Sequence, residues 1–254
     1  MSLRSAEGFL ARTSRMMLTK LVPGIVEVSM KGVITLPMIA QLMEYLEQNG
    51  IKVVSAVMSR RSERGGEMVS ATMFLDFSKS KVSIDEFLKH VERFKLASIE
   101  VLDVPLSTGA INIMSFTLND AKAMLSTAHE MFKSAGKAFL YYLGLGLGKR
   151  KAEEVAICTR IRDPLEYAVL WAQSMGWGEF AIRRSIGKVY VLARNLFECF
   201  REEAEEVSPE PRSQIFRGFL AGFLSRIWGK DVKVVEIKCT AKGDECCEFE
   251  ITPS

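Results

Sequence analysis

The hydrophobic and polar positions of the first hundred residues follow two different periods. Residues 25–30 alternate apolar and polar side chains, as a half-buried strand does. After Thr35, apolar side chains recur every three or four positions up to Asn49, which predicts a helix with Thr35 as its N-cap. Ser83 begins a second helix in the same way. The predicted elements are strands at 25–30, 53–58, 68–77 and 99–104, helices at 35–50 and 83–94, and a charged hairpin loop at 60–66.

The predicted order, βαββαβ, is the ferredoxin-like plan. It resembles that of the ACT regulatory domains, which bind amino acids or pair with one another. The resemblance concerns the order of elements only, and the sequence has no glycine-rich ligand loop of the ACT type, so a dimerisation or scaffold module is an equal alternative. We expect an N-terminal extension at 1–24, a ferredoxin-like (ACT-like) domain at 25–105 and a linker at 106–119.

The pattern changes from residue 120 onward. Apolar positions from Met124 to Tyr142 fall on one face and predict a single long helix. A third helix is expected to start at Ser208 and to run to about Trp228. The other predicted elements are a helix at 164–175, strands at 179–184 and 188–195, and a hairpin at 232–251. The chain is therefore predicted to be α+β, with a second domain at 120–254 in which helices pack on an antiparallel sheet.

Composition limits the classes of function. The chain has 254 residues, of which 48% are hydrophobic and 26% charged, with a net charge of +3. These values are typical of a globular protein with one or two domains. Basic and acidic residues are interspersed, so no nucleic-acid partner is expected. The longest nearly uncharged run, 138–148, is too short to cross a bilayer, and no signal peptide is recognisable. We expect a cytoplasmic protein without a membrane partner.

The last hairpin carries the most specific chemical signal. Glu236 and Cys239 are separated by two residues, and Cys247 follows after seven more. Cys239 and Cys247 are equally distant from Gly243 at the turn, so a symmetric register places them as a cross-strand pair with Cβ atoms about 5 Å apart. Two thiolates so placed can share a zinc ion. Glu236 can add an oxygen ligand, but its odd offset from Cys239 requires a twist or a bulge in the strand.

This region resembles the vinyl-4-reductase domain family. The resemblance covers roughly residues 120–252 and is carried by the segments 218–225, 235–244 and 247–249, with Gly176-Trp177-Gly178 and residues 195–198 as further landmarks. Members include sensor domains of aromatic-responsive transcription regulators, and one protein is linked to bacteriochlorophyll vinyl reduction. The fold is similar to that of subunits of a vesicle-tethering complex. In those sensors, zinc lies beside a buried pocket that holds a small aromatic molecule. The resemblance implies the same arrangement in this chain.

The chain departs from the family at one zinc ligand. Metal-binding members commonly have a cysteine two residues after the proline that opens the third helix, and counting from Pro211 this position is Ser213. A serine hydroxyl is a poor zinc ligand beside thiolates. The implied set is therefore Glu236, Cys239 and Cys247, with Ser213, Cys199 or water as the fourth ligand. Cys246 is disfavoured because it neighbours Cys247 and should point to the opposite face of the sheet.

Each of these residues also has a purely structural interpretation. Cys239, Cys247, Cys199 and Cys158 can be buried thiols that pack as small hydrophobic residues. Gly218 and Gly222, four positions apart, indicate close helix packing. Six residues of the second domain can line a ligand cavity or can simply fill the core. These six are Trp171, Met175, Phe197, Phe216, Phe219 and Phe223.

The sequence indicates a binding protein more than an enzyme. His90 and His129 lie on helices of different domains, and no Ser-His-Asp set or nicotinamide fingerprint is apparent. Residues 144–149 have glycines spaced loosely as in a phosphate loop, but they follow a helix and lack the Walker spacing. The leading hypothesis is a homodimeric zinc-containing sensor of a small hydrophobic or aromatic molecule that acts through a protein partner. The alternatives are an accessory factor of a tetrapyrrole vinyl reductase and a non-catalytic assembly scaffold.

Overall fold

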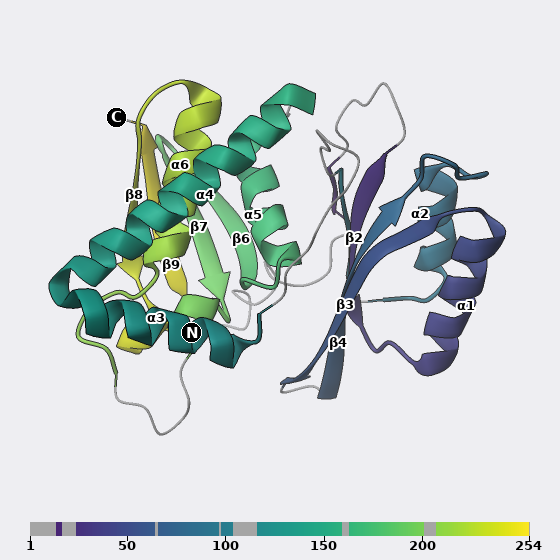
Figure 1. Cartoon of the computed structure of the whole chain (residues 1–254), viewed down its shortest axis with the longest axis horizontal. Coiled ribbons are helices and arrows are strands. Elements are labelled where there is room, and N and C mark those ends of the chain that lie inside the picture. Colours follow the sequence, from purple (N-terminus) through teal and green to yellow (C-terminus); the bar gives the residue numbers. More distant parts are fainter. Residues whose placement is uncertain are drawn as a thin grey trace. The chain divides into compact units, whose positions relative to one another are not determined.

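Two compact units make up the chain in the computed structural model (Figure 1). The first contains residues 1–113 and 157–160, and the second contains 114–156 and 161–254. The structure describes residues 14–16, 24–63, 66–96, 98–103, 116–158, 163–200 and 207–253. Most of the predicted extension and linker, the acidic run 202–206 and the side chain of Cys158 lie outside the described residues.

The first unit is a five-stranded sheet with two helices on one face (Figure 1). The strand order is β1-β5-β2-β4-β3, and every neighbouring pair is antiparallel except β1 and β5. From β2 to β5 the elements follow the predicted βαββαβ order, and β1 is an addition that the sequence did not indicate. The elements are β1 (Ser14–Met16), β2 (Ile25–Gly32), α1 (Leu36–Gln48), β3 (Lys52–Glu63), β4 (Gly66–Asp76), α2 (Ile84–Glu92) and β5 (Ser98–Asp103).

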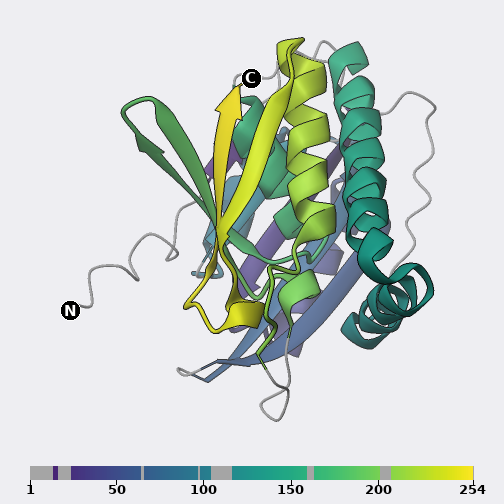
Figure 2. The same ribbon diagram turned by 90° about the vertical axis from the view of Figure 1, so that its left-hand side faces the viewer.

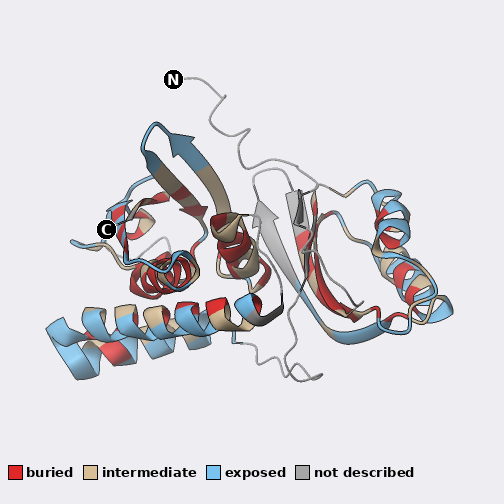
Figure 3. Ribbon diagram, turned by 90° about the horizontal axis from the view of Figure 1, so that it is seen from above, coloured by how far each residue is buried: buried red, intermediate tan, exposed pale blue. Residues whose placement is uncertain are grey.

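The core of this unit lies between the sheet and its helices. Buried positions lie on the sides of the sheet and helices that face one another (Figure 3), and Val26, Leu75 and Phe87 are fully enclosed there. Ser83 closes a capping box with Glu86 at the start of α2, as the N-cap prediction required. The prediction of a loop over the whole of 60–66 is wrong. β3 continues to Glu63 because backbone pairing with β4 needs no apolar side chains.

The second unit is a four-stranded antiparallel sheet in the order β6-β7-β9-β8, with helices packed against it. α6 lies along β8, beside the C-terminal hairpin (Figure 2). The elements are α3 (Leu118–Phe132), η3 (Lys133–Ala135), α4 (Gly136–Cys158), α5 (Pro164–Ser174), β6 (Glu179–Ser185), β7 (Lys188–Arg194), η4 (Phe197–Cys199), α6 (Gln214–Trp228), β8 (Val232–Lys238), η5 (Thr240–Lys242) and β9 (Cys247–Pro253).

The single long helix predicted from Met124 to Tyr142 is wrong, because the chain turns between α3 and α4. Lys133 has φ +47°, which ends α3, and a short 3-10 turn leads to Gly136. A Cβ at Gly136 would lie 2.9 Å from the carbonyl oxygen of Ala128, so this tight corner needs glycine. Of the apolar face that suggested one helix, Ala128 is buried, whereas Met131 and Tyr142 are 71% and 66% exposed.

Two pairs of glycines let α4 and α6 pack at close range. Gly144 and Gly148 of α4 lie against the backbone of Ile215 and Phe219, and Gly218 and Gly222 of α6 lie against the backbone of α4 (Figure 2). The glycine run at 144–148 is thus part of a helix interface and not a phosphate loop. The expectation that Gly218 and Gly222 allow close packing is confirmed.

The start of α6 differs from the prediction. The sequence suggested Ser208, but the helix begins at Gln214, with Ser213 as its N-cap. Pro209 and Pro211 explain the difference, because the residue before a proline is disfavoured in the helical conformation. Residues 208–213 therefore form a non-helical segment in front of α6. None of the helices in the described ranges is long and apolar enough to cross a membrane.

Candidate functional site

A bulge in β8 brings Glu236 and Cys239 to the same side of the hairpin. Glu236 pairs with Phe249 whereas Lys238 pairs with Glu248, so the register shifts by one residue between them. This confirms the prediction that the odd offset needs a bulge. Beyond β8, Cys239 leads into the turn η5, and the backbone N–H of Cys239 donates to Asp244 Oδ2 at 2.8 Å.

Four potential metal ligands converge behind this bulge. The ligand atoms of Cys199, Glu236, Cys239 and Cys247 all lie within 4.8 Å of one another, and the Cys199 and Cys239 sulfurs are 3.4 Å apart. Cys239 and Cys247 are fully buried, while Cys199 is 4% and Glu236 8% exposed. Cys199 comes from η4, Glu236 from β8 and Cys247 from the start of β9. The structure therefore brings the three predicted ligands together with Cys199.

Ser213 lies beside the cluster and holds one of its members in place. Its hydroxyl donates to Glu236 Oε1 at 2.7 Å, and its backbone N–H donates to Glu236 Oε2 at 3.2 Å. The same hydroxyl is 3.0 Å from Cys199 Sγ and 3.9 Å from Cys247 Sγ. Of the two candidates for the fourth ligand, Cys199 contributes a sulfur and Ser213 orients a carboxylate. Cys246 is only half-buried and is not in the cluster.

Hydrogen bonds among the thiols separate their pKa values. The pKa of Cys239 is lowered because the Cys199 and Cys247 thiols hydrogen-bond to its sulfur. The pKa of Cys199 is raised, chiefly because its thiol serves as a donor to Cys239. Burial raises the pKa of Glu236 to about 8, although the Ser213 hydroxyl acts in the opposite direction. A cation here would stabilise the thiolate and carboxylate forms together.

The donor set fits zinc. Thiolates with one carboxylate or imidazole are typical of tetrahedral zinc sites, whereas calcium and magnesium take oxygen ligands. The structure supplies three thiols and one carboxylate in a buried shell. It also holds ligands through neighbouring groups, because Ser213 binds Glu236, and the Thr240 backbone N–H lies 3.4 Å from Cys247 Sγ.

Glu198, next to Cys199, forms a buried cap on α6. Its Oε1 accepts from the Ile215 N–H and its Oε2 from the Phe216 N–H, both at 2.7 Å. Burial raises the pKa of Glu198 to about 8, and these backbone donors oppose that shift. Both oxygens accept N–H bonds at a helix N-terminus, an arrangement that favours the ionised form and opposes the effect of burial. Sequence reasoning missed this residue, because its partners lie 17 and 18 positions away.

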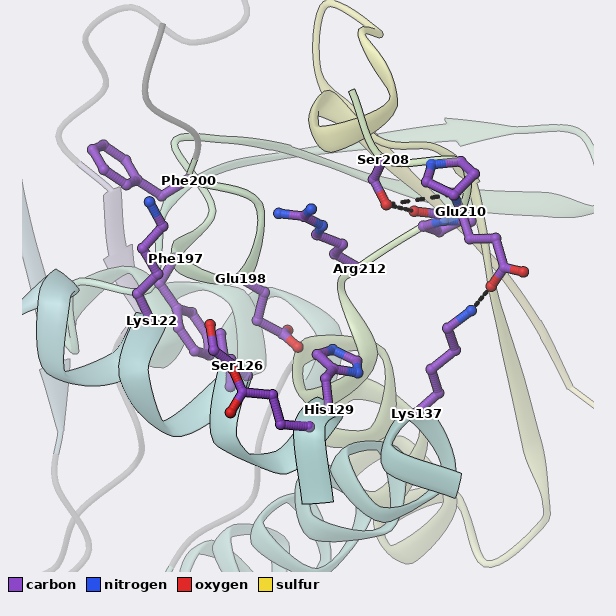
Figure 4. A pocket seen from close by; sticks show the side chains of 14 residues that line it. Lys122, Ser126, His129, Lys137, Phe197, Glu198, Phe200, Ser208, Glu210 and Arg212 are labelled. Atoms are coloured by element: carbon purple, nitrogen blue, oxygen red, sulfur yellow. Dashed lines mark hydrogen bonds and ion pairs between the residues drawn. The ribbon is translucent and has the colours of Figure 1, made fainter. Parts of the chain in front are cut away.

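A pocket of about 700 Å³ lies next to the cluster (Figure 4). α3 and the start of α4 form one side, and the segments 197–200 and 208–212 form the other. His129 lines this pocket, which the sequence did not predict. The lining residues are Lys122, Leu125, Ser126, His129, Glu130, Lys137, Phe197, Glu198, Phe200, Ser208, Pro209, Glu210, Pro211 and Arg212.

The six residues predicted to line a ligand cavity are distributed differently. Phe197 lines the pocket. Trp171 stacks on Phe219 with ring centroids 5.2 Å apart, and Phe219 is tilted against Phe223 at 6.1 Å. Phe216 stacks on Phe180 at 4.7 Å. Met175 is the C-cap residue of α5 and is half-buried. Their role in ligand binding stays a prediction.

Comparison with known proteins identifies the C-terminal part of the chain. Residues 195–253 match the model of the V4R domain, and this segment contains all four cluster residues. The match covers the part of the sequence on which the vinyl-4-reductase resemblance was most specific, so that resemblance is confirmed. No curated protein matches the chain.

Three solved structures are similar in fold. The phenol-responsive sensory domain of the transcription activator PoxR, solved with phenol, is 16% identical, with 68% of this chain and 84% of that chain covered and a TM-score of 0.49. A vinyl-4-reductase family protein from Methanocaldococcus jannaschii is 18% identical, with 56% and 85% covered and a TM-score of 0.38. Subunit 3 of the trafficking protein particle complex from Naegleria fowleri, bound covalently to palmitic acid, is 17% identical, with 54% and 92% covered and a TM-score of 0.42.

Proposed function

We propose that the second unit, which carries the V4R match, is a regulatory sensor domain for a small hydrophobic or aromatic molecule. In this proposal, one zinc ion per chain braces the domain. The V4R match and the cluster of three thiols and one carboxylate support it. The first unit would pair with a second copy or transmit the signal to a protein partner, as an ACT-like module would. The site of action would be the cytoplasm, where the thiols stay reduced.

Cys199, Glu236, Cys239 and Cys247 would hold the zinc, and Ser213 would orient the Glu236 carboxylate. The ion would supply a cross-link between η4, β8 and β9, segments that are separated in the sequence. With four protein ligands, the site would be structural, because catalytic zinc sites keep an open position.

One observation carries the proposal: two segments of the pocket wall, 197–200 and 208–212, lead directly into residues of the cluster or into residues that bind it. Glu198 lines the pocket and Cys199 belongs to the cluster. Arg212 lines the pocket, and the adjacent Ser213 binds Glu236 of the cluster. A ligand that displaces either segment would therefore act directly on the metal ligands, as ligand-dependent regulation requires.

The scaffold alternative has a specific observation in its favour. Trp171, Trp177, Phe219 and Phe223 contact one another ring to ring, so this part of the domain is filled by its own side chains. A domain that bound no ligand would need only such a core. The two readings differ in one measurable respect, because a scaffold would show no saturable binding of small molecules.

Native mass spectrometry of the full chain tests the proposal. One zinc ion per chain is expected in the wild-type protein and in Cys246→Ser, which changes a thiol outside the cluster, whereas Cys239→Ser should lose it. Titration with phenol followed by isothermal calorimetry tests the sensor function. A metal-free wild-type protein that binds no phenol, 2-naphthamide or 2-naphthoate would contradict the proposal and would favour the scaffold.

A further inference from the structure

The pocket beside the cluster contains a positive group that its own carboxylates do not neutralise. Both carboxylate oxygens of Glu198 accept hydrogen bonds from backbone N–H groups of α6, and Glu210 forms an ion pair with Lys137. Glu130, the remaining acidic residue of the wall, is exposed. Within the described part of the chain, Arg212 forms no ion pair, and its side chain extends into the pocket (Figure 4).

His129 lies near Arg212 on the opposite wall (Figure 4). Its pKa is lowered by burial and further by the positive charges of Arg212 and Lys137. The imidazole is therefore mainly neutral at pH 7 and can donate one hydrogen bond. The charges of Arg212 and Lys137 act on this side chain in addition to its burial. A negatively charged group between His129 and Arg212 would meet a favourable field.

The remaining wall is largely apolar. Leu125, Phe197, Phe200 and Pro209 line it, and the Lys122 ammonium lies over the Phe200 ring at 5.9 Å from its centroid. A volume of about 700 Å³ accommodates a small organic molecule. Apolar side chains beside the Arg212 guanidinium favour a ligand with an apolar body and one anionic end.

We infer that this pocket binds a small organic carboxylate, with its carboxylate on Arg212 and His129 and its apolar body against Phe197 and Phe200. A guanidinium binds a planar carboxylate through two parallel hydrogen bonds. A phosphate ligand fits less well, because the N–H groups at the start of α6 that would bind it already bind Glu198. The inference rests on the proposed sensor function of the second unit and specifies its site and its ligand class.

Isothermal titration calorimetry with the full chain tests this assignment. The probes are 2-naphthoate and 2-naphthamide, which share the same ring system and differ in charge. We expect 2-naphthoate to bind saturably and about tenfold more tightly than the amide, because the charge-assisted bonds to Arg212 are available to the carboxylate alone. Arg212→Met should remove this preference, and His129→Leu, which lacks a hydrogen-bond donor, should weaken naphthoate binding severalfold. The matched control is Arg150→Met, which changes an arginine of α4 whose side chain is 72% exposed.

The outcomes separate this inference from the proposed function. Loss of the preference in Arg212→Met, with Arg150→Met unchanged, supports the carboxylate site. Equal binding of the two probes, or no saturable naphthoate binding, overturns it. If phenol or the amide still binds to a zinc-containing protein, the sensor proposal stands and only the carboxylate assignment fails. If Arg212→Met folds poorly in thermal melts followed by circular dichroism, His129→Leu, which removes the hydrogen-bond donor, is the deciding variant. Unchanged naphthoate affinity in His129→Leu overturns the assignment.

Discussion

The sulfur of Cys199 lies 3.4 Å from the sulfur of Cys239, although 40 residues separate them in the sequence. Cys199 belongs to the short turn η4, and Cys239 follows the bulged strand β8. The contact adds a third thiol to a pair that the hairpin alone brings together. It places a sulfur beside Ser213, the position at which metal-binding relatives commonly have a cysteine. The chain thus brings together four potential metal ligands with Cys199, and not position 213, as the fourth.

Moving the fourth thiol from position 199 to position 213 tests this arrangement. We expect Cys199→Ser to lower zinc affinity at least about tenfold, because loss of a ligand should cost no less than loss of an outer-shell partner. Ser213→Cys in the same chain should restore zinc binding, since the Ser213 hydroxyl lies 3.0 Å from Cys199 Sγ and 3.9 Å from Cys247 Sγ. Competition with a chromogenic chelator measures both affinities. Unaltered affinity in Cys199→Ser would rule out a role for this thiol as a ligand.

If the cluster holds the proposed zinc ion, its removal should destabilise the protein. A ligand present at about a thousand times its Kd stabilises the folded state by about 4 kcal/mol. For a domain of 150–250 residues this corresponds to a shift in Tm of about 10 °C. We expect a decrease of this size on chelation, measured by differential scanning calorimetry. Cys239→Ser is the control, because a protein that has already lost the ion should show the same Tm with and without chelator.

The helix interface depends on glycine at specific positions. Gly222→Ala would place a methyl group against the backbone of Leu145, so we expect a loss of at least 1–3 kcal/mol in the free energy of unfolding, about the cost of overpacking a core. Gly146→Ala is the matched control on α4, since nothing lies within 4 Å of its added Cβ. This control should stabilise the helix by up to about 1 kcal/mol. Urea unfolding followed by far-ultraviolet circular dichroism gives both values.

Local patterns anticipated much of the fold and the hairpin half of the site. The strands and helices of the first unit, the β8–β9 hairpin and its bulge follow from periodicity and from the spacing of Glu236, Cys239 and Cys247. The break at Lys133 was missed because its positive φ interrupts a continuous apolar pattern. Cys199 was one of several alternatives for the fourth ligand, and the sequence could not choose among them. The roles of Glu198 and of the pocket were not derivable, since each depends on segments that meet only in the folded chain. The start of α6 was misplaced because Ser208 and Pro209 look like a helix start.

The buried cap on α6 should contribute measurably to stability. Glu198→Gln replaces one carboxylate oxygen with an NH₂ group, which would face the N–H of Ile215 or Phe216. We expect a cost of about 1–3 kcal/mol, because a buried donor would then be unsatisfied. Glu245→Gln is the control, as Glu245 is 82% exposed and lies 3.4 Å from Arg194. Equal free energies of unfolding for the two variants in urea would show that the cap is dispensable.

His90 should make the first unit sensitive to acid. Its ring stacks on Tyr45 at 3.8 Å, and its Nε2 is buried without a hydrogen-bond partner among the described residues. Burial lowers the pKa of His90 below its usual 6.5, and the charge of Arg93 lowers it further. Below pH 6.5 the unfolded chain therefore binds a proton that the folded chain resists. Stability should fall as the pH drops from 6.5 toward the folded pKa and should be regained above 6.5.

Nuclear magnetic resonance and denaturant unfolding together check this dependence. The ring-proton shifts of His90 should titrate below pH 6.5 in the native protein. Urea unfolding between pH 7 and pH 5 should show a smaller loss of stability in His90→Gln than in the wild type, because glutamine takes up no proton. His129→Gln is the control for the first unit: His129 also has a lowered pKa but belongs to the second unit, so the His90 titration should be unchanged in this variant. A native His90 titration at 6.5 or above would contradict the assignment, as would the same pH dependence in wild type and His90→Gln.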